Sequence, residues 1–248
     1  MDTITSRKNV YIQHLRRLST DASYRDSERE YVCEGMKPLR EALEYGADVR
    51  SVLWKETPEA LSGLENVRQY IAPAELFDYA STMTNSPGPI FTVSMPEFDR
   101  KAISGAVVLE NVQDPGNVGT VIRTANAFGI DAVILTGACA DLYNPKAVRS
   151  TMGAVFRQRV LKTDIDGLRK ILEENGLKLY GAALSDSASD IRQAKLTNAA
   201  AAIGSEGKGL SAELLEMCDE QIIIPMDPCS ESLNAAVAAS LVMWEMVR

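Results

Sequence analysis

Five apolar runs in the second half of the chain constrain the fold more than any other feature. They cover residues 106–109, 132–135, 177–184, 199–203 and 222–224. Strands that are buried on both faces have such nearly unbroken apolar sequences, and they belong to parallel sheets covered by helices. Helical patterns separate the runs at residues 118–128, 166–175 and 212–217, and a last helix is expected from Leu233. This alternation predicts an α/β domain with a parallel sheet.

The first half of the chain alternates shorter strands and helices. Strands are expected at residues 30–34, 49–54, 67–71 and 90–93, and helices at residues 10–18, 38–45 and 73–79. Thr57 is placed to cap one more short helix, beginning at Pro58. The polar stretch 96–104 is either a hinge or a loop inside one domain, and the change of strand pattern after it favours the hinge. We therefore expect a small α/β domain at 1–95, a linker at 96–104 and a second domain at 105–248.

Several classes of protein are disfavoured by composition. The chain has one histidine, His14, and four cysteines without a CxxC pair, so a zinc site or another metal site is not expected. A Ser-His-Asp triad is disfavoured for the same reason. No apolar stretch approaches the length of a membrane span, and the first residues lack the apolar centre of a secretory signal. A soluble cytoplasmic protein without membrane contact is expected.

The net charge of −8 counts against a large nucleic-acid-binding surface. Binding depends on local potential, however, and basic residues gather in two places. These are Arg7, Lys8, Arg16 and Arg17 in the first helix, and Lys146, Arg149, Arg157, Arg159 and Lys162. The first cluster is either an RNA clamp or a solvated helix face. Any RNA footprint should be small.

Three segments carry the functional signal, and each follows an apolar run. In the first, a polar turn leads into a helix on which Arg123 and Asn126 share a face. Such turns bind ligands at the carboxyl edge of parallel sheets. From the spacing alone, the plainer interpretation is favoured, in which Asn117 only caps the helix and Arg123 is a solvated surface side chain.

The second segment is the glycine-rich stretch 203–211. Its order is GxxGxG, and Gly209 follows Lys208, so neither the dinucleotide pattern nor the Walker pattern is present. An ordinary nucleotide- or NAD-dependent enzyme is therefore disfavoured. Glu206 favours a neutral or cationic ligand, held by backbone groups that glycine lets approach closely. The third segment, 224–240, joins a strand to a helix rich in small residues.

Together the three segments resemble the sequence motifs of the SpoU (TrmH) family of SPOUT methyltransferases. The first motif matches at Asn117, Gly119, Arg123, Thr124, Ala125, Ala127, Phe128 and Gly129, the second at residues 204–211, and the third at 224–226 and 232–234. The N-terminal part is similar to the family's RNA-binding domain more loosely, through Ser6, Arg7, Asn9, Arg25, Glu34 and Gly35. It departs at residues 85–90, where relatives often have Pro-Gln-Gly-Ile.

The resemblance implies a deep trefoil knot in the C-terminal domain, S-adenosylmethionine as cofactor, and a homodimer whose active site is completed across the interface. The implied cofactor contacts are Gly204, Gly209, Ile224, Met226 and Leu233. The implied catalytic group is Arg123, assisted by Asn117, Glu206, Ser232 and Asn234. The RNA-binding candidates are Arg7, Lys8, Arg25, Lys146 and Arg149.

The implied reaction is methyl transfer to a ribose 2′-hydroxyl of RNA, with 23S ribosomal RNA first and transfer RNA as the alternative. A non-catalytic RNA-binding homologue is the other alternative. The family assigns activation of the hydroxyl to the arginine that matches Arg123. Because a free guanidinium is a poor base at neutral pH, we rank phosphate binding and charge stabilisation first and proton removal second.

Overall fold

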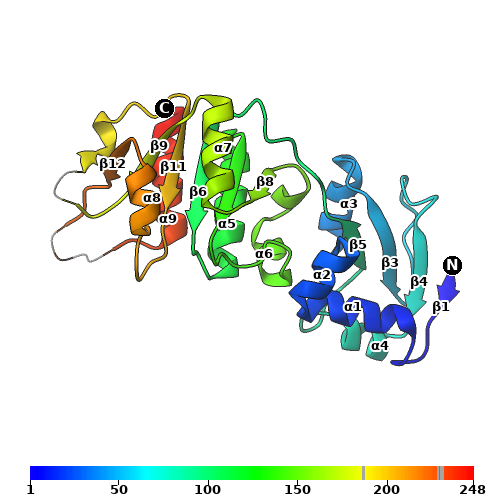
Figure 1. The fold of residues 1–248 in the computed structure, drawn as a ribbon. Helices are drawn as coiled ribbons and strands as arrows, with labels where there is room; N and C mark the ends of the chain where they lie inside the picture. Colours follow the sequence, from blue (N-terminus) through cyan, green and yellow to red (C-terminus); the bar gives the residue numbers. More distant parts are fainter. Residues whose placement is uncertain (186–187, 228, 230–231) are drawn as a thin grey trace. The chain divides into compact units, whose positions relative to one another are not determined.

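A computed structural model describes residues 1–185, 188–227, 229 and 232–248 of the chain. The chain forms two compact units, which are described one at a time. Unit 1 comprises Met1–Glu97 and Tyr143–Phe156, and unit 2 comprises Phe98–Leu142 and Arg157–Arg248. Figure 1 labels the elements of both units.

Unit 1 contains a mixed sheet in the order β1-β4-β3-β5-β2. Its strands are β1 (Asp2–Thr3), β2 (Glu30–Glu34), β3 (Val49–Lys55), β4 (Arg68–Ala72) and β5 (Ile90–Ser94). β3 pairs in parallel with β4 and antiparallel with β5. Its helices are α1 (Val10–Thr20), α2 (Ala22–Glu28), α3 (Met36–Glu44), α4 (Ala74–Ala80) and α6 (Pro145–Ser150).

The amphipathic helix α1 supplies one side of the unit 1 core. Ile12, Leu15 and Leu18 recur at helical spacing and are fully buried, packed with side chains from the sheet and from α4. The side chain of Asn9 caps the helix by accepting a hydrogen bond from Tyr11 N at 2.9 Å. Each buried leucine of this kind contributes on the order of 2 kcal/mol of hydrophobic stabilisation.

The segment 143–156 packs in unit 1, although our expected second domain, 105–248, included it. Two aromatic contacts explain the assignment. The Tyr143 ring lies 4.5 Å from the Tyr31 ring, and the Phe156 ring lies 6.4 Å from the Phe91 ring, centroid to centroid. Val148 and Val155 are also buried.

Unit 2 contains a parallel sheet in the order β10-β12-β9-β11-β6-β7-β8. Its strands are β6 (Gly105–Glu110), β7 (Ala132–Thr136), β8 (Arg159–Lys162), β9 (Lys178–Ala182), β10 (Ser189–Asp190), β11 (Ala199–Ile203) and β12 (Glu220–Ile223). Its helices are α5 (Pro115–Phe128), α7 (Ile165–Asn175), α8 (Ala212–Met217) and α9 (Ala235–Val247). The predicted α/β class with a parallel sheet is confirmed.

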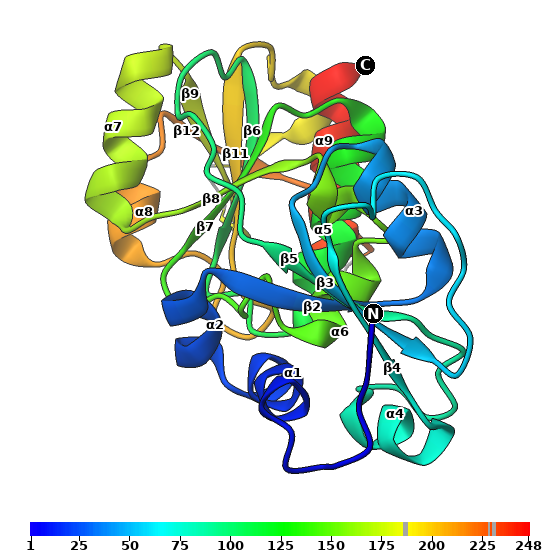
Figure 2. The same ribbon diagram turned by 90° about the vertical axis from the view of Figure 1, so that its right-hand side faces the viewer.

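Helices cover both faces of this sheet, as the apolar runs predict. Figure 2 shows α7 and α8 on one side and α5 and α9 on the other. Along β6, Ala106 and Val108 pack in the core cluster that contains α7 and α8 residues. Val107 and Leu109 alternate with them and are equally buried, because the opposite face is covered as well.

Some local predictions were wrong or incomplete. No helix forms after Thr57, because only a few residues separate Pro58 from the turn at Ser62 and Gly63. The helices α2 and α6 and the strands β8 and β10 were not expected. Among the residues that the structure describes, no helix has the length and hydropathy to cross a bilayer.

Candidate active site

A pocket of about 600 Å³ lies at the carboxyl edge of the unit 2 sheet, where β9, β11 and β12 end side by side. Its volume is in the range of small-molecule sites, roughly 300–1,000 Å³. The carboxyl ends of parallel strands are the usual ligand-binding edge of such sheets. The walls come from residues 182–184, 203–210, 215, 222–224, 226, 232, 233, 235 and 238.

All five residues predicted to contact a cofactor line this pocket: Gly204, Gly209, Ile224, Met226 and Leu233. They come from two loops and the approach to α9, so the fold brings together what the sequence separates. Of the predicted catalytic residues, Glu206 and Ser232 also line it. Most other wall residues are apolar, and Glu206 and Lys208 are the charged side chains among the described wall residues.

The glycine-rich loop after β11 folds back on itself. Gly209 N donates a hydrogen bond to Ser205 O at 2.9 Å, and Gly209 has a φ of +65°. A Cβ on Gly204 would overlap the backbone carbonyl of Gly209. Glycine at position 204 is therefore required by the close approach of two backbone segments in the pocket wall.

A relay of side-chain hydrogen bonds joins the three motif segments at the pocket. Asn234 Nδ2 donates to Asn117 Oδ1 at 3.1 Å, and Asn117 Nδ2 donates to Glu206 Oε1. Asn234 also caps α9, since its Oδ1 accepts from Ala236 N at 3.0 Å. Asn117 lies in the first turn of α5, whose cap is Asp114 and not Asn117. The amide of Asn117 is thereby left to connect the other two motifs.

Sequence reasoning missed Glu110, the last residue of β6. Its carboxylate is 3% exposed and accepts hydrogen bonds from Ser211 N at 2.7 Å and Ser211 Oγ at 2.6 Å. It therefore fixes the end of the glycine-rich loop to the strand of the first motif. A charged residue closing an otherwise apolar strand was the available signal, because buried carboxylates need partners.

Arg123, the predicted catalytic group, is not among the residues that line the pocket. It lies on α5 with an exposed side chain, and it makes no hydrogen bond or ion pair with any residue that the structure describes. Its neighbour in the motif, Asn126, accepts a hydrogen bond from Arg157 Nε at 2.9 Å. Among the residues that the structure describes, Arg123 therefore has no partner, and its side chain is exposed on the surface of unit 2.

The RNA-binding candidates lie in unit 1 and differ in exposure. Lys8, Lys146 and Arg149 are exposed, and so is Arg7, which pairs with Glu75 at 2.9 Å. Arg25 is only 2% exposed and donates to Leu18 O, so its role is to stabilise the junction of α1 and α2. The part of the chain that the structure describes holds no group of three or more His, Cys, Asp and Glu side chains arranged for a metal.

Comparison with known proteins places this geometry in a family. The model of the SpoU rRNA Methylase family matches residues 104–244. The 23S rRNA (guanosine(2553)-2′-O)-methyltransferase RlmP of Bacillus subtilis (strain 168) is 34% identical over 248 residues, 99% of each chain. The 23S rRNA (uridine(2479)-2′-O)-methyltransferase of Streptomyces viridochromogenes is 29% identical, over 99% of this chain and 91% of that one.

A solved structure agrees over both units. The SpoU methyltransferase AviRb from Streptomyces viridochromogenes, in complex with the cofactor AdoMet, superposes with a TM-score of 0.86 at 27% identity. The match covers 97% of this chain and 98% of that one. The chain therefore belongs to the SpoU rRNA Methylase family.

Proposed function

We propose that this protein transfers the methyl group of S-adenosylmethionine to a ribose 2′-hydroxyl of ribosomal RNA. The observation that carries the proposal is the pocket at the carboxyl edge of the unit 2 sheet. Its walls contain the glycine-rich loop, and the relay Asn234–Asn117–Glu206 joins the three family motifs beside it. Relatives named as 23S rRNA 2′-O-methyltransferases support ribosomal RNA as the substrate.

The residues of the pocket fit S-adenosylmethionine. The pocket's volume of about 600 Å³ and its apolar walls suit a nucleoside with an amino-acid tail. The turn at Gly204 and Gly209 brings backbone groups close to a ligand. The carboxylate of Glu206 suits a cationic ligand and would repel a pyrophosphate. When bound, the cofactor would supply a methyl group carried on a sulfonium. The rest of the cofactor is then the leaving group, a neutral thioether.

The protein's own groups must then orient the ribose 2′-hydroxyl, which is a poor nucleophile, and help remove its proton. The relay fixes the amide of Asn117 and the carboxylate of Glu206, and Ser232 adds a hydroxyl at the rim. We assign Arg123 first to holding the phosphate beside the target ribose and to stabilising negative charge on the 2′-oxygen. We rank proton removal by Arg123 as its second role, because a guanidinium stays protonated at neutral pH and is therefore a poor base.

A homodimer would let Arg123, which does not line the pocket of its own chain, serve the pocket of the partner subunit. Val237, Leu241 and Trp244 are 48%, 42% and 52% exposed and follow one another at helical spacing on α9. The Trp244 ring also contacts Phe128 of α5, with centroids 5.7 Å apart. This apolar stripe supports an isologous interface between two copies, with each copy's Arg123 serving its partner's pocket.

Three further parts of the proposal follow from family membership. The last helix, α9, threads a loop to form a trefoil knot. The exposed cations of unit 1, Lys8, Lys146 and Arg149, contribute to RNA binding. Ribosomal RNA as the substrate would place the protein in the cytoplasm.

The experiment is transfer of radiolabel from S-adenosylmethionine to RNA by the purified protein. Transcripts of 23S rRNA and of tRNA serve as separate substrates, and 2′-O-methyl mapping then locates the nucleotide. We expect label in 23S rRNA, and none with Arg123→Ala or Arg123→Lys. Label in tRNA alone would replace the substrate, and donor binding without transfer to any RNA would indicate a non-catalytic homologue. Near wild-type kcat in either Arg123 variant would contradict both roles of that residue.

A further inference from the structure

Unit 1 contains two adjoining pockets that the proposed chemistry does not use. One, the basic pocket, has a volume of about 280 Å³ and lies between α1, the residues after α4 and the start of α6. The other, the apolar pocket, has a volume of about 220 Å³ and lies between α3 and α6. Thr82, Pro145 and Arg149 belong to the walls of both. The two spaces are therefore neighbours separated by one layer of side chains.

The basic pocket has the chemistry of a phosphate site. Arg16, Lys146 and Arg149 line it together with several hydroxyl groups, and none of its described wall residues is acidic. In a chain with a net charge of −8, such a concentration of positive charge is a local exception. Arg16 is held in place, because its Nη1 donates to Tyr79 O at 2.9 Å and its guanidinium lies 4.7 Å from the centroid of the Tyr79 ring.

The apolar pocket has the chemistry and size of a site for one flat ring. Pro38, Val148 and Phe156 form part of its wall. Met83 and Met152 also line it and are 36% and 55% exposed. Methionine adapts its shape and packs well against aromatic rings. The volume of about 220 Å³ lies below that of sites for drug-sized ligands, roughly 300–1,000 Å³, so it suits a single nucleobase.

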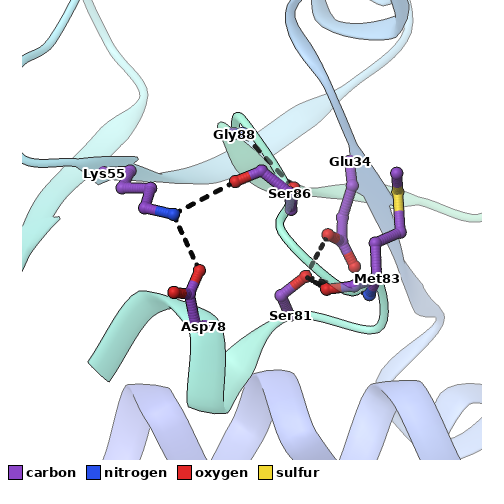
Figure 3. A network of polar contacts seen from close by, with 7 residues as sticks. All are labelled: Glu34, Lys55, Asp78, Ser81, Met83, Ser86 and Gly88. Atoms are coloured by element: carbon purple, nitrogen blue, oxygen red, sulfur yellow. Dashed lines mark hydrogen bonds and ion pairs between the residues drawn. The ribbon is translucent and has the colours of Figure 1, made fainter. Parts of the chain in front are cut away.

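The loop shared by the two pockets is held in a fixed shape. The buried carboxylate of Glu34 accepts a hydrogen bond from Ser81 Oγ at 2.7 Å (Figure 3). It also accepts one from Thr82 N at 2.6 Å. Arg149 Nη1 donates to Thr82 Oγ1 at 3.0 Å and so joins α6 to this loop. Further along, Lys55 Nζ bridges Asp78 Oδ1 at 2.8 Å and Ser86 O at 3.3 Å. A preorganised loop reduces the entropy that binding would otherwise cost.

We propose that unit 1 captures one unstacked nucleotide of the substrate RNA, with its phosphate in the basic pocket and its base in the apolar pocket. This inference rests on the proposed function, because it assumes an RNA substrate. Proteins recognise RNA mainly through bases that are splayed out of single-stranded loops and bulges. A site for one such nucleotide explains how an acidic protein selects RNA with a small footprint. It also gives the exposed methionines a role.

The test measures the affinity of the full-length protein for a fluorescent fragment of 23S rRNA that the wild-type enzyme methylates. Anisotropy titrations at several salt concentrations separate the two halves of the site. Lys146→Gln with Arg149→Gln should raise the Kd about tenfold and lower the slope of log Kd against log salt by about 1. Met83→Ala with Met152→Ala should raise the Kd about tenfold and leave the slope unchanged.

Two control variants lie in unit 1 outside both pockets. Arg68→Gln removes an exposed cation and Val10→Ala an apolar side chain that is 84% exposed, and neither should change the Kd more than about twofold. In the pocket variants, kcat at saturating RNA should stay close to wild type while KM rises. That division separates a binding role from damage to the fold or to the reaction.

The outcomes distinguish this inference from the function on which it rests. If the wild-type protein methylates no RNA, the proposed function fails first. If it methylates RNA and both pocket pairs bind like the controls, the nucleotide site is wrong. A further experiment tests whether the basic pocket binds free inorganic phosphate. Stabilisation of the wild type by millimolar phosphate, lost in the Lys146 and Arg149 pair without any change in RNA affinity, would assign the basic pocket to free phosphate and overturn the proposal.

Discussion

Asn234 donates a hydrogen bond to Asn117 across 3.1 Å, and this bond links residues that lie 117 positions apart in the chain. Asn234 caps the start of α9, and Asn117 lies in the first turn of α5, so the starts of two adjoining helices are tied together. Asn117 passes the link on to Glu206 in the pocket wall. The orientation of the carboxylate therefore depends on a residue that does not itself line the pocket.

Replacing Asn117 should damage turnover more than cofactor binding. Asn117→Ala removes both the donor to Glu206 and the acceptor for Asn234. A hydrogen bond to a charged group is worth about 1.5–3 kcal/mol, so kcat should fall by about 10- to 100-fold. Calorimetry with S-adenosylhomocysteine should give a Kd close to that of the wild type. Asn117→Ala combined with Asn234→Ala should cost less than the two losses added, and strict additivity would show that the relay does not act as a unit.

The glycine-rich loop should tolerate a methyl group at one glycine and not at another. Gly204→Ala places a Cβ on the Gly209 backbone, so the loop must open, and donor binding should be lost together with about 1–3 kcal/mol of stability. Gly207→Ala is the matched control for stability, because its added Cβ meets no atom within 4 Å and its φ is not in the left-handed region. Calorimetry and thermal melts measure both effects. Equal melting temperatures in the two variants would contradict the packing argument.

The sequence predicted the unit 2 sheet well, because burial on both faces leaves a direct mark on composition. The runs at 106–109 and 199–203 became β6 and β11, neighbours at the centre of the sheet. The sequences of the short strand β8 and the helix α6 have no comparable apolar pattern. Their stability depends on tertiary packing, such as the contact of Tyr143 with Tyr31, and local sequence does not encode such contacts.

The sequence named candidate members of the site, but it could not give their geometry. The resemblance to the family named Asn117, Glu206 and Asn234, but their connection in a single relay follows only from the packing of α5 against α9. Glu110 was missed because a carboxylate at a strand end is ordinarily solvated. Arg25 was grouped with the RNA-binding candidates because the N-terminal part resembles the family's RNA-binding domain there, and its burial could not be seen in the sequence.

Mixed dimers should show whether Arg123 acts in its own chain or in the partner's pocket. Arg123→Ala and Glu206→Ala should each be inactive alone. If Arg123 serves the partner, a mixed dimer of the two variants contains one intact site. Random reassortment should then restore about a quarter of the wild-type rate. If Arg123 acts within its own chain, each site in the mixture carries a defect and no activity returns.

The proposed dimer interface on α9 can be tested with the same purified protein. Leu241→Glu places a charge in the exposed apolar stripe of α9 and should give monomers in sedimentation velocity. Val10→Glu changes a more exposed apolar residue of unit 1 and should leave the oligomeric state as it is. A wild-type protein that sediments as a monomer would contradict the proposed dimer directly.

Asp131 should make unit 2 less stable in acid. Burial raises the pKa of the Asp131 carboxyl, but hydrogen bonds from Ser104 and Gly105 and the charge of Arg159 lower it more, so the pKa lies below its usual value of 3.8. Ser104 Oγ and Ser104 N both donate to Asp131 Oδ2 at 2.7 Å. A depressed folded-state pKa stabilises the fold above the unfolded pKa, and the contribution is lost as the pH falls through the folded pKa.

Asp131→Asn should therefore lower the free energy of unfolding by about 1 kcal/mol at pH 7, a value already reduced for solvent screening. The difference from wild type should shrink as the pH falls below 3.8 and through the lower pKa of the folded protein, because the wild-type carboxyl becomes protonated over that range. Urea denaturation at pH 7 and pH 3 measures it, with Glu173→Gln as an exposed acidic control on α7. A difference that stays constant or grows in acid would mean that the Asp131 contacts stabilise the fold by packing and not through the ionised carboxylate.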